Sequence, residues 1–174
     1  MIKTTEIKDV KVFKPKIFSD NRGYVFESYN EKVFNKYVKD FFPIQDNESK
    51  SNFGVLRGIH FQKSPFEQAK LVRVIKGKVQ DIAVDLRPNS KTYKKYISVI
   101  LSDENKNQIF IPKGFGHAFL TLSNEAIVSY KVNCYYNRES EFGYKFDDPS
   151  INIKWELNHD EIILSEKDEK LTYL

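Results

Sequence analysis

The sequence predicts a mostly β protein, folded as an antiparallel sandwich or barrel with short flanking helices. Short segments alternate apolar and polar side chains at a period of two, and turn residues separate them at short intervals. Aromatic residues are abundant, with 14 Phe and 10 Tyr against 7 Gly and 6 Pro. The chain has 174 residues, of which 40% are hydrophobic. That size fits one domain with a sizeable core, so we expect residues 1–174 to form a single domain.

The N-terminal part of the chain predicts two strands and one helix. Alternating residues indicate strands over Val10–Pro15 and Gly23–Tyr29, with a turn at 19–23 between them. Asn30 is a favourable helix cap, and the apolar positions after it recur at a spacing of three to four. A short helix is therefore expected over 31–39.

Further short β segments follow, separated by residues rich in Asn, Ser, Pro and Gly. The expected strands are 43–48, 54–62, 70–76, 78–86, 95–101, 108–111, 117–123, 126–136 and 151–155. Residues 158–174 mix polar and apolar side chains, which is typical of a short helical tail.

The central hairpin around Gly77 carries charged residues within its β pattern. Lys70 shares one face of the first strand with two valines, and Asp81 and Asp85 share one face of the second strand. Charged groups on strands that also supply core residues favour a pocket inside a sheet or barrel. The alternative is that Lys70, Asp81 and Asp85 lie on the solvent face of an ordinary hairpin.

Charge and composition exclude several classes of protein. The chain has 28 basic and 24 acidic residues, a net charge of +4, and it lacks the clustered basic stripe expected of a nucleic-acid-binding protein. It has neither a signal-peptide core nor an apolar run long enough to span a bilayer, so no membrane association is expected. Cys134 is the only cysteine, which excludes an intrachain disulfide and favours inert packing in a reducing, cytoplasmic compartment.

The histidines and glycines do not predict a metal or cofactor site. His60, His117 and His159 show no ligand spacing, and the residue two positions after His60 is Gln62. Glycine-rich loops of the dinucleotide or phosphate-binding kind are also absent from the sequence. What remains is acid–base chemistry by side chains, through a histidine with tyrosine and lysine as proton donor and charge stabiliser.

Two of the acid–base candidates also have structural interpretations. Tyr130 shares its strand face with apolar residues and should point inward, either toward a substrate or as a core tyrosine bonded to the backbone. Asp168 stands three residues after Ser165, a pattern typical of a helix cap.

Several motifs at consistent spacing resemble the dTDP-4-dehydrorhamnose 3,5-epimerase family, from about residue 10 to residue 168. The motifs are Arg57–Gln62, Gln68–Arg73, Asp81–Arg87, Phe110–Phe119, Tyr135–Tyr136, and Asp147–Pro149 with Ile153–Trp155. The resemblance implies a cupin-type jelly-roll fold, no metal or organic cofactor, and a homodimer. It also implies epimerisation at C3 and C5 of a nucleotide-diphosphate-linked 4-keto-6-deoxy sugar, most closely dTDP-4-dehydro-6-deoxyglucose.

The resemblance implies a role for each acid–base candidate. His60 matches the general base, and Asp168 matches the acid that orients its imidazole. Lys70 matches the residue that stabilises the enolate oxygen, which is an electrostatic role suited to a charge that forms during the reaction. Tyr130 matches the proton donor on the other face of the sugar.

The substrate-binding residues follow from the same resemblance. Arg57, Gln45 and Asn47 match positions that hold the diphosphate and sugar, and a guanidinium suits phosphate. Tyr136 matches an aromatic residue beside the nucleotide. The N-terminal segment 1–29 matches one that crosses to the partner subunit and meets its nucleotide, through Phe18, Arg22 and Glu27.

Some alternatives stay open at this point. Asp81 and His117 align with positions in or near the pocket, and either could instead be a buried hydrogen-bonded acid or a core histidine. The chain departs from the family's usual Trp-Asn-Asp-Pro at Phe146–Pro149, and Glu156 replaces a proline. Alternative functions are a C3-only or C5-only epimerase, a GDP- or CDP-sugar epimerase, a 3,4-ketoisomerase, or a non-catalytic sugar-binding module.

Overall fold

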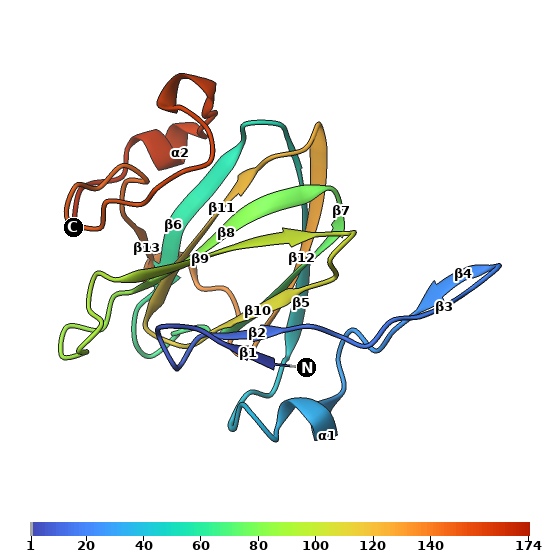
Figure 1. The fold of residues 1–174 in the computed structure, drawn as a ribbon. Coiled ribbons are helices and arrows are strands. Elements are labelled where there is room, and N and C mark those ends of the chain that lie inside the picture. The colour runs from blue at the N-terminus through green and yellow to red at the C-terminus, as the bar shows by residue number, and fades with distance from the viewer. Residues whose placement is uncertain (1) are drawn as a thin grey trace.

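The computed structural model describes residues 2–174, and two antiparallel sheets face each other to form its body (Figure 1). The larger sheet has the strand order β1-β2-β10-β7-β12-β5. Its strands are β1 (Ile2–Thr4), β2 (Lys11–Phe13), β5 (Gln45–Asn52), β7 (Lys70–Lys76), β10 (Gln108–Ile111) and β12 (Glu125–Val132). The smaller sheet has the order β13-β6-β11-β8-β9. Its strands are β6 (Leu56–Gln62), β8 (Lys78–Asp85), β9 (Tyr96–Ser102), β11 (Phe115–Thr121) and β13 (Glu141–Gly143).

The remaining elements are short. They are the hairpin β3 (Phe18–Asp20) and β4 (Gly23–Val25), the helices α1 (Glu31–Phe34) and α2 (Glu166–Glu169), and the 3-10 turns η1 (Arg138–Ser140) and η2 (His159–Glu161). Among the described residues, no helix has the length and apolar character needed to cross a membrane.

Alternation along the strands divides the apolar residues between the inside and the outside of the sandwich. One cluster fills the space between the sheets and includes Val72 and Val74 of β7 with Val79 and Ala83 of β8. On the outer face of the larger sheet, a second cluster packs α1 and its following loop through Phe34. Positions 70, 72 and 74 therefore face inward, because side chains along a strand point alternately to its two faces.

The segment 151–155 is not a strand, and the prediction there is wrong. Ile151 and Ile153 are buried against the outer face of the smaller sheet, which explains the alternation. Asn152 between them has φ +54, outside the extended region. The Gln80 side chain supplies hydrogen bonds that a neighbouring strand would otherwise make. It donates to the Lys154 carbonyl at 2.8 Å and accepts from the Glu156 N–H at 2.9 Å.

Several other boundaries differ from the sequence prediction. The helix expected over 31–39 ends after one turn, although Asn30 does cap it by accepting a hydrogen bond from the Val33 N–H. The strand expected over 126–136 ends at Val132, beyond which the Asn133 side chain accepts from the Ala69 N–H. The tail 158–174 contains only η2 and α2 as single turns. Strands β1, β3 and β13 have three residues each and were not predicted.

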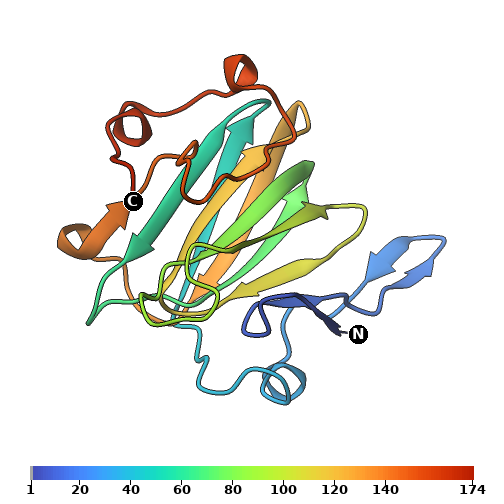
Figure 2. The same ribbon diagram turned by 60° about the vertical axis from the view of Figure 1, so that its left-hand side comes forward.

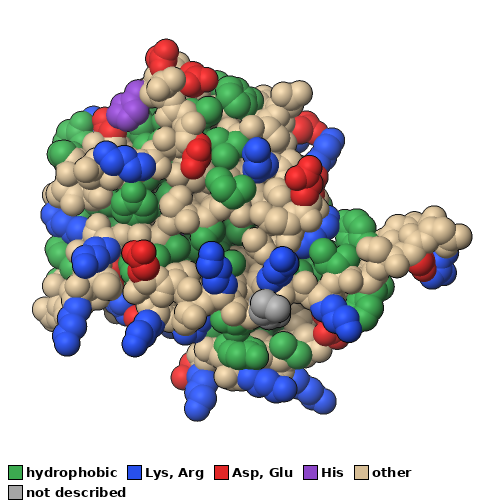
Figure 3. All heavy atoms as spheres, in the orientation of Figure 1, with side chains coloured by type: hydrophobic (Ala, Val, Ile, Leu, Met, Phe, Trp, Pro, Cys, Tyr) green, Lys and Arg blue, Asp and Glu red, His purple; other side chains and the backbone are tan. Residues whose placement is uncertain are grey.

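The hairpin β3–β4 projects from the body as an arm (Figures 1 and 2). Phe18, Tyr24 and Val25 on it are 54%, 57% and 67% exposed. The Lys106 ammonium donates to the Tyr24 hydroxyl at 2.7 Å, where the arm meets the body. Lys and Arg side chains are scattered over the face seen in Figure 3 and do not form a single stripe there.

Gly58 brings β6 unusually close to β11. Its φ is +129, and a Cβ built on it would lie 2.4 Å from the Ala118 Cβ. Only glycine meets both conditions without strain. Two residues further along β6, His60 pairs directly with His117 of β11.

Candidate active site

Polar side chains replace the apolar core in one part of the space between the sheets. The larger sheet contributes Lys70 from β7 and Tyr130 from β12, and the smaller sheet contributes His60 from β6. Two adjoining cavities of about 320 and 290 Å³ share these three residues and Glu141 as walls. The sequence-predicted acid–base residues therefore meet at one place.

His60 is held by a carboxylate from the far end of the chain. Its Nε2–H donates to Asp168 Oδ1 at 2.5 Å. In the neutral imidazole this leaves Nδ1 as the nitrogen with the lone pair, so the ring can act as a base at that atom. The His60 side chain is 25% exposed and Asp168 only 5%, so the base is accessible while its partner is enclosed.

Asp168 occupies the short helix α2 and has two roles there. The Ser165 side chain accepts a hydrogen bond from the Asp168 N–H at 3.2 Å, which confirms the predicted cap. Burial opposes ionisation of the Asp168 carboxyl, but hydrogen bonds with His60 and Ser165 outweigh it and lower its pKa. An ionised carboxylate is the form that fixes the imidazole tautomer.

The surroundings of Lys70 lower the pKa of its ammonium group. Burial lowers the pKa of its ammonium to about 8, although the carboxylates of Asp81 and Glu141 act in the opposite direction. Its Nζ lies 5.9 Å from the centre of the Tyr130 ring. A cation in this position can stabilise an oxygen anion that forms in the cavity.

Tyr130 lines both cavities and packs against the core between the sheets. Burial raises the pKa of its hydroxyl, and the Glu141 carboxylate also raises it, whereas Arg57 acts in the opposite direction. The phenol is therefore protonated at neutral pH and available as a proton donor.

His117 and Asp81 form a second pair, and His117 lines the smaller of the two cavities beside His60. His117 Nε2–H donates to Asp81 Oδ2 at 2.9 Å, and both side chains are buried. Burial lowers the pKa of His117, although the Asp81 carboxylate opposes this. Asp81 Oδ1 is buried and has no hydrogen-bond partner within the described part of the chain.

The solvent-face interpretation of the central hairpin is wrong for both aspartates of β8. Asp81 and Asp85 are each 0% exposed, and Lys70 is half-buried. Asp85 accepts hydrogen bonds from Arg87, Ser90 and Thr92, so it orders the turn after β8. Of these two aspartates, Asp81 is the one that lies beside the candidate site.

The sequence has extensive similarity to known proteins. A family described as dTDP-4-dehydrorhamnose 3,5-epimerase matches residues 4–174. A dTDP-4-dehydrorhamnose 3,5-epimerase from Shigella flexneri is 49% identical over 165 residues, covering 94% of this chain and 90% of that protein. The chain belongs to the dTDP-4-dehydrorhamnose 3,5-epimerase family. The resemblance found in the sequence is thereby confirmed.

Solved structures of the epimerase family share the fold. A 3,5-epimerase from Legionella pneumophila in complex with dTDP-4-keto-L-rhamnose superposes with a TM-score of 0.96 at 43% identity, covering 99% of this chain and 92% of that one. A 3′-monoepimerase from Streptomyces bikiniensis in complex with dTDP-quinovose gives 0.91 at 30% identity, covering 98% and 86%. The expected jelly-roll fold is confirmed.

Four of the binding residues implied by the epimerase family line the same cavities. Gln45, Asn47 and Tyr136 border one of them, and Arg57 borders the other. The Gln45 side chain donates to Asn47 Oδ1 at 2.7 Å and accepts from the Tyr136 N–H at 3.4 Å. Arg57 donates to the Ser51 hydroxyl at 3.0 Å, which directs its guanidinium along β5.

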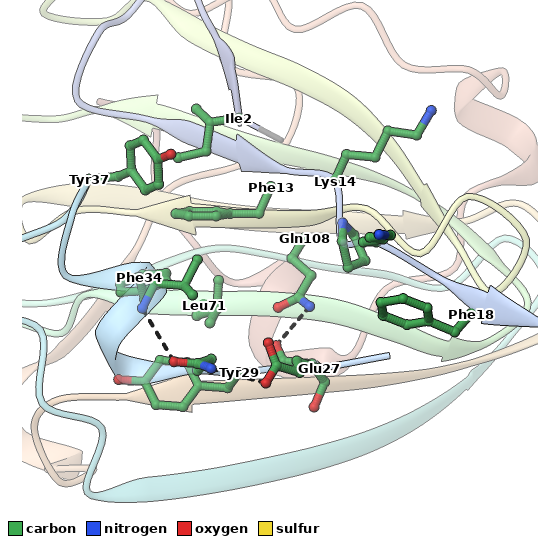
Figure 4. Close-up of a pocket in the computed structure, with 15 residues that line it drawn as sticks. Ile2, Phe13, Lys14, Phe18, Glu27, Tyr29, Phe34, Tyr37, Leu71 and Gln108 are labelled. Carbon is green, nitrogen blue, oxygen red and sulfur yellow. Dashed lines mark hydrogen bonds between the residues drawn. The ribbon is translucent and has the colours of Figure 1, made fainter. Parts of the chain in front are cut away.

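The other three binding residues implied by the epimerase family lie apart from His60. Phe18 and Glu27 line an apolar groove of about 300 Å³ between the base of the arm and α1 (Figure 4). Arg22 sits at the tip of the arm, paired with Asp20 at 2.5 Å. A single chain does not bring them to the acid–base cluster.

Glu141 is the site residue that sequence reasoning missed. It lies on β13, lines both cavities, and its Oε2 accepts from the Tyr136 hydroxyl at 2.7 Å and the Lys167 ammonium at 2.6 Å. It belongs to no motif that carries chemistry. The only available signal is its place between the Tyr135–Tyr136 and Asp147–Pro149 segments of the epimerase resemblance.

Proposed function

We propose that this chain is an epimerase that inverts C3 and C5 of dTDP-4-dehydro-6-deoxyglucose to give dTDP-4-dehydrorhamnose. One observation carries the proposal. A histidine held by a carboxylate faces the same cavity as a tyrosine and a lysine with a lowered pKa. That arrangement fits removal of a proton beside a ketone and its return on the opposite face.

The first half-reaction breaks a carbon–hydrogen bond next to the 4-ketone. His60 takes the proton at its free nitrogen, and Asp168 stabilises the imidazolium that forms. The electron pair of the broken bond moves into the ring, so the carbonyl oxygen becomes an enolate oxygen. Lys70 stabilises this new negative charge, which exists only after proton removal.

The second half-reaction forms a new carbon–hydrogen bond on the opposite face of the sugar. Tyr130 donates its hydroxyl proton to the enolate carbon, and the electron pair returns to restore the ketone. The configuration at that carbon is then inverted, with no net oxidation or reduction. The imidazolium of His60 then releases its proton to water and the Tyr130 phenolate takes one up, so the same groups can serve C3 and C5, both neighbours of C4.

Nucleotide and diphosphate recognition falls to residues at the rim of the cavities. Arg57 supplies a guanidinium for the diphosphate, while Gln45 and Asn47 offer amide groups to sugar or phosphate oxygens. Tyr136 lies next to them and is 54% exposed, which leaves its ring free to contact a base or sugar.

Proton exchange with solvent tests the reaction directly. Purified protein is incubated with dTDP-4-dehydro-6-deoxyglucose in deuterated water, and the sugar is followed by NMR. We expect deuterium at both C3 and C5, because each inverted carbon receives a proton from a group in exchange with water. The same incubation without protein is the control. Deuterium incorporation no greater than in this control would refute the epimerase proposal.

A single-carbon epimerase is the second candidate function. The similarity to a 3′-monoepimerase favours considering it, since one fold accommodates both reactions. The deuterium experiment separates the two, because label at one carbon alone identifies the single-carbon enzyme. Parallel assays with dTDP-, GDP- and CDP-linked 4-keto sugars identify the nucleotide.

We also propose that the active form is a homodimer. Phe18, Arg22 and Glu27 lie on or beside an arm with exposed apolar residues, away from the chain's own acid–base cluster. The arm of one subunit would then reach the nucleotide of the other.

The free Cys134 fits a reducing compartment such as the cytoplasm. The expectation that the reaction needs no metal is tested by elemental analysis of the purified protein.

A further inference from the structure

Glu141 presents an electrostatic problem that the proposed reaction does not explain. It is an anion in the wall of cavities that would receive a doubly charged diphosphate. Like charges at short range repel, and the repulsion is stronger where water is partly excluded. Its side chain is only 18% exposed, so solvent screens it incompletely. The proposed reaction gives the Glu141 carboxylate no role that would offset this repulsion.

The contacts of Glu141 connect the two ends of the site. On one side its Oε2 accepts from the hydroxyl of Tyr136, the residue whose N–H donates to Gln45. On the other side the same oxygen pairs with Lys167 at 2.6 Å. Lys167 immediately precedes Asp168, and Asp168 holds His60 at 2.5 Å.

The position of β13 makes this connection direct. β13 pairs antiparallel with β6, with Glu141 opposite Gln62 and Gly143 opposite His60. The strand that carries the base is therefore flanked by the strand that carries Glu141. In Figure 1, α2 and the C-terminal segment lie along the β6 side of the body. The Lys167 pair and the His60–Asp168 pair fasten α2 to these two strands.

We propose that Glu141 is a positioning residue of the epimerase, whose carboxylate ties α2, and with it Asp168, to the substrate-binding residue Tyr136. Lys167 and the Tyr136 hydroxyl compensate its charge, which makes an anion tolerable beside a diphosphate. Its second effect is electrostatic, because it favours the ammonium form of Lys70. This inference rests on the proposed epimerase function.

The main test compares Glu141→Gln with Glu139→Gln. Glutamine keeps an acceptor for Tyr136 but cannot pair with the Lys167 charge. We expect kcat to fall by about 10- to 100-fold, the range for a displaced catalytic group, with a smaller change in KM. Glu139 is an exposed residue of η1 outside both cavities, so the matched substitution there should leave kcat and KM as in the wild type.

The pH profile distinguishes positioning from a loss of folding. Removing the Glu141 charge favours neutral Lys70, so the alkaline limb of kcat/KM should move to lower pH in Glu141→Gln. Lys167→Met breaks the link from its exposed end and keeps the Glu141 charge. We expect it to lower kcat without moving that limb to lower pH. The kcat of the double variant Glu141→Gln/Lys167→Met should be no lower than that of the less active single variant, because both substitutions break the same Glu141–Lys167 contact.

The outcomes separate this inference from the proposed function. Wild-type protein that places no deuterium on the sugar would refute the epimerase reaction itself. An active wild type together with a Glu141→Gln variant that matches Glu139→Gln in kcat and in pH profile would overturn the role of Glu141 alone. Should Glu141→Gln fail to fold, a Lys167→Met variant with wild-type kcat gives the same negative answer.

Discussion

Two histidine–carboxylate pairs lie side by side in this protein, and both imidazoles line one cavity but differ in how much of each is exposed. The His60 side chain is 25% exposed and its partner Asp168 is 5% exposed. The His117 side chain is 7% exposed and its partner Asp81 is 0% exposed. The two imidazoles even occupy directly paired positions of β6 and β11. Their chemistry is the same, and their surroundings are different.

The difference shows what a histidine needs in order to transfer protons. Asp168 approaches His60 from α2, outside the two sheets, and leaves the other ring nitrogen toward a site that substrate can enter. Asp81 approaches His117 from the adjacent strand β8, within the sandwich. The His117 side chain lines the smaller cavity but is 7% exposed against 25% for His60, so substrate reaches its ring less readily. We therefore propose a proton-transfer role for the His60 pair and a structural role for the His117 pair.

The largest expected effect is the loss of activity in His60→Ala. We expect kcat to fall by at least ~100-fold, the usual contribution of a general base, and the free energy of unfolding to fall by about 1–3 kcal/mol, because the buried Asp168 carboxylate loses its His60 donor. Steady-state kinetics and urea unfolding measure the two quantities. His159→Ala, at an exposed histidine outside the cavities, is the control. A His60→Ala variant that retains most of its kcat would refute the role of His60 as the general base.

The next effect is on stability, in His117→Leu. Leucine removes the hydrogen bond of the neutral imidazole and leaves the buried Asp81 carboxylate without this donor, which costs about 3 kcal/mol. Urea unfolding should show this loss, while kcat of the folded variant falls far less than in His60→Ala. The opposite pattern, with unchanged stability and a kcat as low as that of His60→Ala, would make His117 a proton-transfer group and remove the distinction between the pairs.

The smallest effect is a change in the pH profile on replacing Lys70. Because the Lys70 ammonium has a pKa of about 8, its charge is present below that pH and is lost above it. We expect kcat/KM of the wild type to decline as pH rises through about 8. Lys70→Arg should lack this decline, since a guanidinium stays protonated throughout the accessible range. If the decline persists in Lys70→Arg, another group causes it.

Two strands were predicted to the residue, because local and tertiary requirements agree there. Residues 70–76 and 108–111 match β7 and β10 as observed. Residues 151–155 show the limit of the same rule. Ile151 and Ile153 alternate because they cover the outer face of the smaller sheet, and the hydrogen bonds come from the Gln80 side chain. Alternating apolar residues indicate that every second side chain is buried, and a segment outside a sheet can meet this condition as well as a strand can.

The candidate site was predictable to different degrees. Local sequence predicted the cap at Ser165 but not the His60–Asp168 contact, because those residues are 108 positions apart and only the family resemblance joins them. It left the surroundings of Asp81 undecided, since exposure depends on what covers β8. It missed Glu141, because an isolated glutamate near a turn looks like any solvated residue until β13 pairs with β6.

Gly58 has a consequence for how this enzyme tolerates change. Its missing side chain sets the separation of β6 and β11, and so the depth at which His60 enters the gap opposite Lys70 and Tyr130. An added methyl group would spread the two strands without touching any atom of a sugar. A residue that takes no part in proton transfer thus helps to set where the histidine stands, because its hydrogen atom is all that fits against Ala118.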